Sequence, residues 1–146
     1  MGKYQGSIAA DVILGRDARL DDHAGGPLSP RVVFTDPQVA AVGHTLESAL
    51  AAGIDARAVD YETEAVAAGS FYGRGAAGTS RLVVDETRRI VVGATFVGPD
   101  VAEFVHAATI AIVGEVPLER LWHATPSFPT RSEVWLRLLE TYERSH

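Results

Sequence analysis

Cysteine is absent from this chain of 146 residues. The chain alone therefore has no disulfide, no thiolate nucleophile and no sulfur-ligated metal site, and the absence fits a reducing compartment. Also missing are an apolar run of the roughly 18 residues that a membrane-spanning helix needs and the apolar stretch of a signal peptide after Lys3. Basic residues number only 13 against 19 acidic ones, and the formal net charge is −6. Because phosphate binding needs clustered Lys and Arg, nucleic acid is not an expected partner. We expect a cytoplasmic protein.

What is present indicates one soluble globular domain, since 47% of the residues are hydrophobic and 22% are charged. The histidines show no spacing typical of metal ligands, so we predict no metal site. They are His23, His44, His106, His123 and His146. His123 lies beside a proline-rich loop, and a small hydrolase using it with Glu133 stays open, although no serine has the glycine neighbours of a nucleophile elbow.

Hydrophobic periodicity and turn residues predict an α+β fold in which a roughly five-stranded antiparallel sheet is covered by helices. Thr45 and Asp100 are expected to cap two of the helices. Glycine-rich residues 73–78 precede a strand rather than a helix, so we predict a plain bend there and not a dinucleotide loop. Strands are expected at 32–34, 39–42, 56–61, 82–85 and 90–97, and helices at 1–16, 46–52, 100–113, 117–121 and 131–142.

The stretch HATPSFPTRSEVWLRLL, residues 123–139, has two interpretations. Thr130 and Glu133 fit a capping box at the start of the last helix, which requires no function. Alternatively, Pro126 and Pro129 fix the backbone of a rigid, extended loop that projects Phe128 out of the domain. The residues alone leave both interpretations open.

Three phrases carry a family resemblance. The segment VVFTDPQVAAVGHTLESALAAGI resembles the start of the C-terminal interface (dimerisation) domain of the pyridine nucleotide-disulfide oxidoreductases, and RLVVDETRRIVVGATFVGPDVAEFVHAATIAI resembles its hairpin and following helix. GKYQGSIAADVILG resembles the helix that closes the flavin domain. The resemblance implies that residues 1–30 are the end of that helix plus a linker and that residues 31–146 are the dimerisation domain.

The family's Rossmann glycine motifs and redox cysteine pair are not in this chain. The resemblance therefore implies the last domain of a longer homodimeric flavoenzyme, with FAD and NAD(P) in the full-length protein. By itself the piece is expected to be inactive and to bind no cofactor. A free-standing binding or regulatory module with the same fold is the alternative.

In the family, a His-Pro-Thr-x-x-Glu phrase brings a histidine base to the partner subunit's active site. Aligning FPTRSE with it puts Phe128 at the histidine and Glu133 at the glutamate, whereas the other register puts Thr125 at the histidine. A phenyl ring cannot transfer a proton, so the acid–base role is lost. The resemblance then implies that Phe128 and Pro129 contact the partner's FAD, and that Glu133 is mainly a helix cap.

The missing base further implies an acceptor other than a disulfide: a quinone-like compound, or the chemistry of the mercuric reductase branch, which also carries an aromatic residue there. For the homodimer contact we expect the last helix, through Trp135, Leu138 and Leu139, and the helix at 101–113. The apolar face of the first helix, with Ile8 and Val12, is expected either to fray or to dock against another copy.

Overall fold

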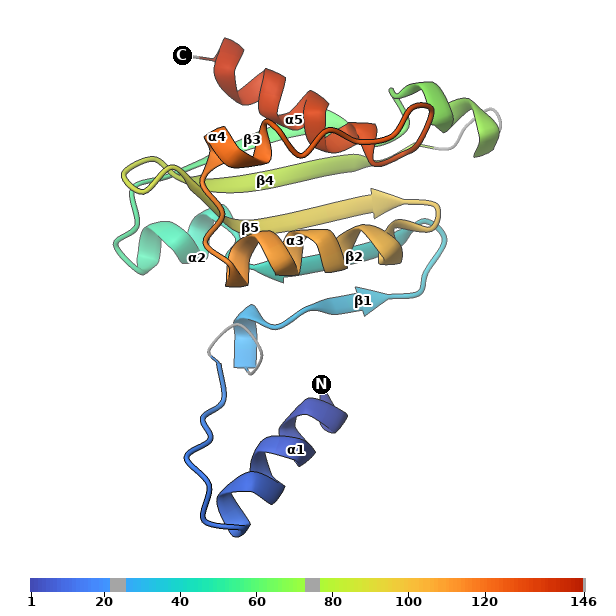
Figure 1. The fold of residues 1–146 in the computed structure, drawn as a ribbon. Helices are drawn as coiled ribbons and strands as arrows, with labels where there is room; N and C mark the ends of the chain where they lie inside the picture. The colour runs from blue at the N-terminus through green and yellow to red at the C-terminus, as the bar shows by residue number, and fades with distance from the viewer. Residues whose placement is uncertain (22–25, 73–76, 146) are drawn as a thin grey trace.

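The computed structural model describes residues 1–21, 26–72 and 77–145. Its centre is one sheet with the strand order β1-β2-β5-β4-β3, in which every neighbouring pair is antiparallel (Figure 1). The predicted α+β fold with a five-stranded antiparallel sheet is confirmed. The strands are β1 (Arg31–Val33), β2 (Gln38–Gly43), β3 (Ala56–Glu62), β4 (Thr79–Asp85) and β5 (Ile90–Gly98).

Helices lie before, between and after the strands, close to the predicted positions. The predicted bend at 73–78 falls mainly outside the described residues. The α-helices are α1 (Gly2–Ile13), α2 (Leu46–Ala51), α3 (Phe104–Val113), α4 (Leu118–Leu121) and α5 (Glu133–Arg144), and the 3₁₀ helices are η2 (Gly26–Leu28), η3 (Ala67–Tyr72) and η4 (Val101–Glu103). None of the described helices is long and apolar enough to cross a membrane.

Both faces of the sheet bury apolar side chains, because successive side chains of a strand point to opposite faces. The larger core joins strand residues such as Leu82 and Phe96 to Ala108 of α3 and Leu138 of α5. The smaller core joins Ala49 of α2 to Val83, Ile90 and Val92 on the other face. Hence α3 and α5 cover one face, and α2 covers part of the opposite one.

The two predicted helix caps have different outcomes. The Thr45 cap is confirmed, because its hydroxyl accepts a hydrogen bond from the Ser48 amide at 3.1 Å. The Asp100 cap is wrong. Asp100 has a left-handed backbone (φ 52°) and makes no side-chain cap hydrogen bond, and the chain enters α3 through η4. An N-cap residue needs an extended backbone for its side chain to reach the free amides, which Asp100 lacks.

Helix α1 has no buried residue and lies apart from the sheet (Figure 1). It ends at Ile13, three residues before the predicted end, and Gly15 follows with a left-handed backbone (φ 72°). Val12 is 56% exposed and Ile13 83% exposed. The apolar face of α1 is therefore left uncovered by the described residues of the chain.

Candidate functional site: an exposed aromatic loop beside an apolar groove

The segment between α4 and α5 carries Phe128 at the surface, with 77% of the residue exposed. Pro129 follows it, and the Thr130 hydroxyl donates a hydrogen bond of 2.6 Å to the carbonyl oxygen of Ser127. This bond closes a tight turn around Phe128. The phenyl ring therefore points away from the domain's own core, which is the placement expected of a projecting side chain.

The predicted capping box of Thr130 and Glu133 is wrong. Helix α5 begins at Glu133, and its N-cap residue is Ser132, which makes no side-chain cap hydrogen bond. The Thr130 hydroxyl is used within the preceding turn, so it is not available to the helix amides. Residues 131 and 132 form a turn before the helix, whereas the Thr-x-x-Glu pattern places them in its first helical turn.

Glu133 is a buried connector rather than a cap. Its Oε1 accepts a hydrogen bond of 2.7 Å from Arg137, one helical turn on, and its Oε2 accepts one of 3.4 Å from the Ala67 amide in η3. Hydrogen bonds to Glu140 and Glu133 raise the pKa of Arg137 above its ordinary value. The first turn of α5 is thus tied to η3 and to its own second turn.

A second connection to the same region was not predicted. Arg131 donates a hydrogen bond to Glu64, and their side chains are only 8% and 5% exposed. The Arg131 guanidinium also lies over the Phe104 ring, 4.9 Å from its centroid. The two charged residues are 67 positions apart in the chain, so no local pattern could reveal the pair.

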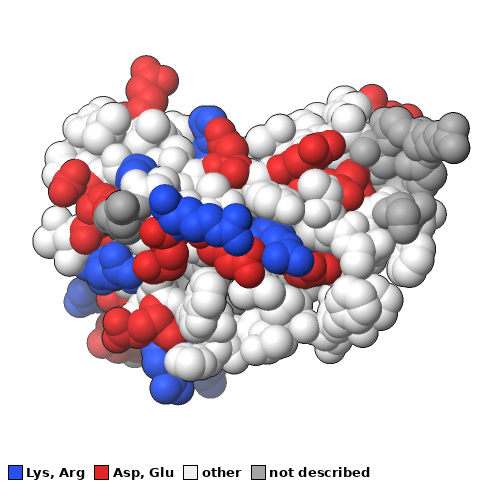
Figure 2. Space-filling model, turned by 90° about the horizontal axis from the view of Figure 1, so that it is seen from above, with Lys and Arg blue, Asp and Glu red and all other residues white. Residues whose placement is uncertain are grey.

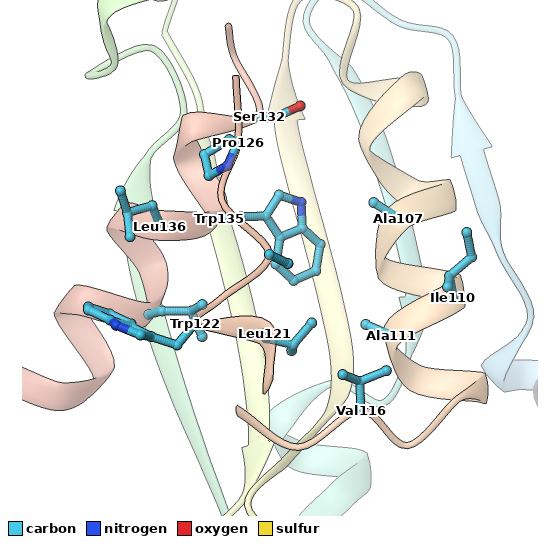
Figure 3. A pocket seen from close by; sticks show the side chains of 12 residues that line it. Ala107, Ile110, Ala111, Val116, Leu121, Trp122, Pro126, Ser132, Trp135 and Leu136 are labelled. Atoms are coloured by element: carbon cyan, nitrogen blue, oxygen red, sulfur yellow. The ribbon is translucent and has the colours of Figure 1, made fainter. Parts of the chain in front are cut away.

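An apolar groove of about 440 Å³ lies beside this segment, between α3 and α5. Figure 3 shows the Trp135 ring between the two helices, and its centroid lies 6.1 Å from that of the core residue Phe96. We call it the α3–α5 groove. Its walls include Ile110 and Ala111 of α3, Leu121, Trp122, Pro126, and Trp135 and Leu136 of α5.

The rim of the groove is unusually apolar for an exposed surface. Of the residues that line the groove, Ile110 is 58% exposed and Trp122 is 43% exposed. Val113, at the end of α3, is 47% exposed. By contrast, Leu138 is 0% exposed and packs in the larger core, so the prediction that it reaches a partner is wrong. Leu139 is 4% exposed but lines the groove, so for this residue the contact stays a prediction. Trp135 lines the groove, and α3 exposes Ile110 and Val113, so a contact through these two helices stays a prediction.

The surface over α5 has the opposite character. Seen from above, basic and acidic side chains alternate there (Figure 2). Arg137 pairs with both Glu133 and Glu140, and Arg89 pairs with Glu143 at 3.0 Å. Because these charges already have partners on the same chain, this face does not offer the apolar contact that the groove offers.

The histidines do not form a site in the described part of the chain. His106 and His123 are exposed, and His44 Nδ1 lies 3.0 Å from the Ser48 hydroxyl at the start of α2. Among the described residues no three His, Asp or Glu side chains are placed to hold a metal ion. His23 and His146 lie outside the described residues.

Comparison with known proteins gives concordant results from sequence and structure. A dihydrolipoyl dehydrogenase of Halobacterium salinarum is 33% identical over 136 residues, which are 93% of this chain and 28% of the relative. One of Chlamydia pneumoniae is 31% identical over 136 residues, or 92% and 28%. The chain thus spans about 28% of the length of these curated relatives.

Two solved structures share the fold. LpdA from Mycobacterium tuberculosis matches with a TM-score of 0.79 at 22% identity, over 94% of this chain and 29% of LpdA. The HOCl-induced flavoprotein disulfide reductase RclA from Escherichia coli matches with a TM-score of 0.78 at 24% identity, over 92% and 30%. Residues 29–139 match the family described as pyridine nucleotide-disulphide oxidoreductase, dimerisation domain. This chain belongs to that family of dimerisation domains.

Proposed function

We propose that this chain is the homodimerisation domain of a FAD-dependent NAD(P)H oxidoreductase, and that the α3–α5 groove and its rim form the contact between two copies. The family match supports dimerisation, and the exposed groove residues Ile110 and Trp122 support the location. A twofold contact uses the same surface patch on both subunits, so one apolar groove with its exposed apolar residues is sufficient to form both halves of the interface. The flavin and nicotinamide domains belong to parts of the protein outside this chain.

The second part of the proposal concerns Phe128 and Pro129, which contact the FAD of the partner subunit in the intact enzyme. Its support is the 77% exposure of Phe128 and the hydrogen-bonded turn that holds it. A bound flavin supplies the hydride and electron transfer. The phenyl ring packs against a flat aromatic group and excludes water from it, but it holds no transferable proton. The proposal therefore favours an acceptor that needs no base from this loop, such as a quinone-like compound or a metal ion.

The single observation that carries the first part is the exposure of Ile110, and it provides the test. Ile110→Asp places a carboxylate at the centre of the proposed contact. Because burying an unpaired carboxylate in an apolar contact costs more than about 1.4 kcal/mol, the dissociation constant should rise by about tenfold or more. Sedimentation velocity over a range of concentrations measures it.

The matched control is Leu50→Asp, an equally large change at a residue of α2 that is 54% exposed. Helix α2 covers the opposite face of the sheet, so this variant should associate like the original chain. Circular dichroism checks that both variants are folded. Unchanged association of Ile110→Asp, or loss of association in Leu50→Asp alone, would place the contact elsewhere.

A separate test addresses Phe128. In the full-length protein, Phe128→Ala should leave the dimer mass unchanged and should shift the flavin absorbance and fluorescence, because the ring that excludes water is removed. An exposed aromatic residue away from the flavin would leave both spectra as they were, and that outcome would refute the contact with FAD.

A further inference from the structure

The Phe128 loop is held at its C-terminal end by a buried ion pair. Arg131 is the third residue after Phe128 and immediately precedes Ser132, the N-cap of α5. One of its Nη atoms donates to Oε1 of Glu64. The cation–π contact with Phe104 adds a second restraint on the same guanidinium. Arg131 therefore fixes the point at which the loop returns to the domain.

Glu64 is attached to a rigid part of the sheet. The preceding residue, Thr63, is fully buried, and its hydroxyl lies 2.9 Å from the Ser80 hydroxyl and donates a bond of 2.9 Å to the Val97 carbonyl. On the other side, η3 packs so closely that a Cβ added at Gly69 would come within 2.0 Å of the Glu64 carbonyl oxygen. The backbone that carries the Glu64 carboxylate is thus hydrogen-bonded on one side and closely packed on the other.

The hydrogen bonding of the Glu64–Arg131 ion pair is incomplete, so its role is not explained by stability alone. No described residue donates a hydrogen bond to the buried Oε2 of Glu64. A buried charge pair gains net stability only when its remaining lone pairs are satisfied, and an apolar pair of similar volume would often serve as well. In some proteins a buried ionic group instead specifies one conformation, and the arrangement of Glu64 and Arg131 fits that role.

We propose that Glu64 and Arg131 are positioning residues that hold Phe128 in the orientation needed at the partner subunit's flavin. The assignment rests on the proposed function of Phe128. On this proposal, the residues just after β3, which are distant in the sequence, help to set the orientation of Phe128 at the flavin. Neither residue touches the cofactor, and both act through the loop.

The absence of cysteine allows a direct measurement of loop order. Ser127→Cys, at an exposed position, accepts a single nitroxide label beside Phe128, and Glu47→Cys on α2 accepts a control label. Arg131→Met should cause loss of the immobilised component of the spectrum at position 127 and no change at position 47. Arg131→Lys keeps the positive charge but lacks the paired N–H donors of the guanidinium, so it should give an intermediate spectrum. This variant replaces Arg131→Met in the test if the Met variant does not fold.

Double variants at positions 64 and 131 distinguish the effect of charge pairing from that of packing. The exchanged pair Glu64→Arg with Arg131→Glu should recover immobilisation, whereas the apolar pair Glu64→Leu with Arg131→Met should not. Immobilisation retained in Arg131→Met, or equally restored by the apolar pair, would overturn the proposal. Sedimentation velocity of the same variants measures dimerisation independently. Loss of the Glu64–Arg131 restraint on the loop is therefore distinguishable from loss of the dimer.

The link to the flavin is tested in the full-length protein. Arg131→Met and Phe128→Ala should shift the flavin absorbance in the same direction, and the double variant should shift it no further than Phe128→Ala alone, because both act through one ring. Additive shifts would mean that Arg131 affects the flavin by another route and would contradict the assignment.

Discussion

Asp60 and Arg81 face each other across β3 and β4 and form two hydrogen bonds, of 2.6 and 2.7 Å. These bonds lower the pKa of Asp60 below its ordinary value of 3.8. The pair therefore stabilises the fold above pH 3.8, and this contribution disappears as the pH falls through the lower pKa of the folded state. Because both side chains are nearly half exposed, solvent screening limits it to less than about 1 kcal/mol.

Arg81→Met should accordingly lower the free energy of unfolding slightly at pH 7 and by a smaller amount near pH 2. Urea unfolding at both values measures the two differences. A variant whose deficit is the same at pH 2 and pH 7 would show that the loss comes from packing and not from the charged hydrogen bonds.

At the scale of elements, two threonines that look alike in the sequence have different roles. Thr45→Ala should cost about 1 kcal/mol, because its hydroxyl caps α2. Thr130→Ala should cost clearly less, since its hydroxyl bonds to an exposed loop carbonyl and α5 begins without it. Denaturant titration of the two variants checks the order. Equal losses of unfolding free energy in the two variants would indicate that Thr130 also caps its helix and would contradict the structure.

Local signals explain which elements could be predicted. The hairpin of β4 and β5 and the cap at Thr45 involve residues a few positions apart, so turn and capping chemistry visible in the sequence is sufficient. The start of α5 was misplaced because the Thr130 hydroxyl bonds to the Ser127 carbonyl instead of a helix amide, which the Thr-x-x-Glu pattern does not reveal. The pair of Glu64 and Arg131 could not be found, since only the folded sheet brings the end of β3 to the start of α5.

For the molecule as a whole, periodicity indicates that a helix has an apolar face but not what covers it. Leu138 and Ile110 both lie in apolar stretches of the sequence, yet the first is at 0% exposure in its own core and the second is at 58% on the groove rim. The prolines near Phe128 indicate a rigid loop but not whether its ring is exposed, and the groove next to it depends on how α3 and α5 pack.

Helix α1 provides a prediction at the same scale. Because it buries no residue, deletion of residues 1–21 should leave the free energy of unfolding within about 0.5 kcal/mol of the complete chain. Thermal and urea unfolding measure this. A larger loss would show that the apolar face with Ile8 and Val12 docks against a second copy in solution.

The account depends on the association of two chains through the α3–α5 groove. Light scattering coupled to size exclusion at micromolar concentration gives the molar mass directly. We predict twice the 15.5 kDa of a single chain, falling toward that value on dilution or with Ile110→Asp. A mass of one chain at every concentration would contradict the proposed function.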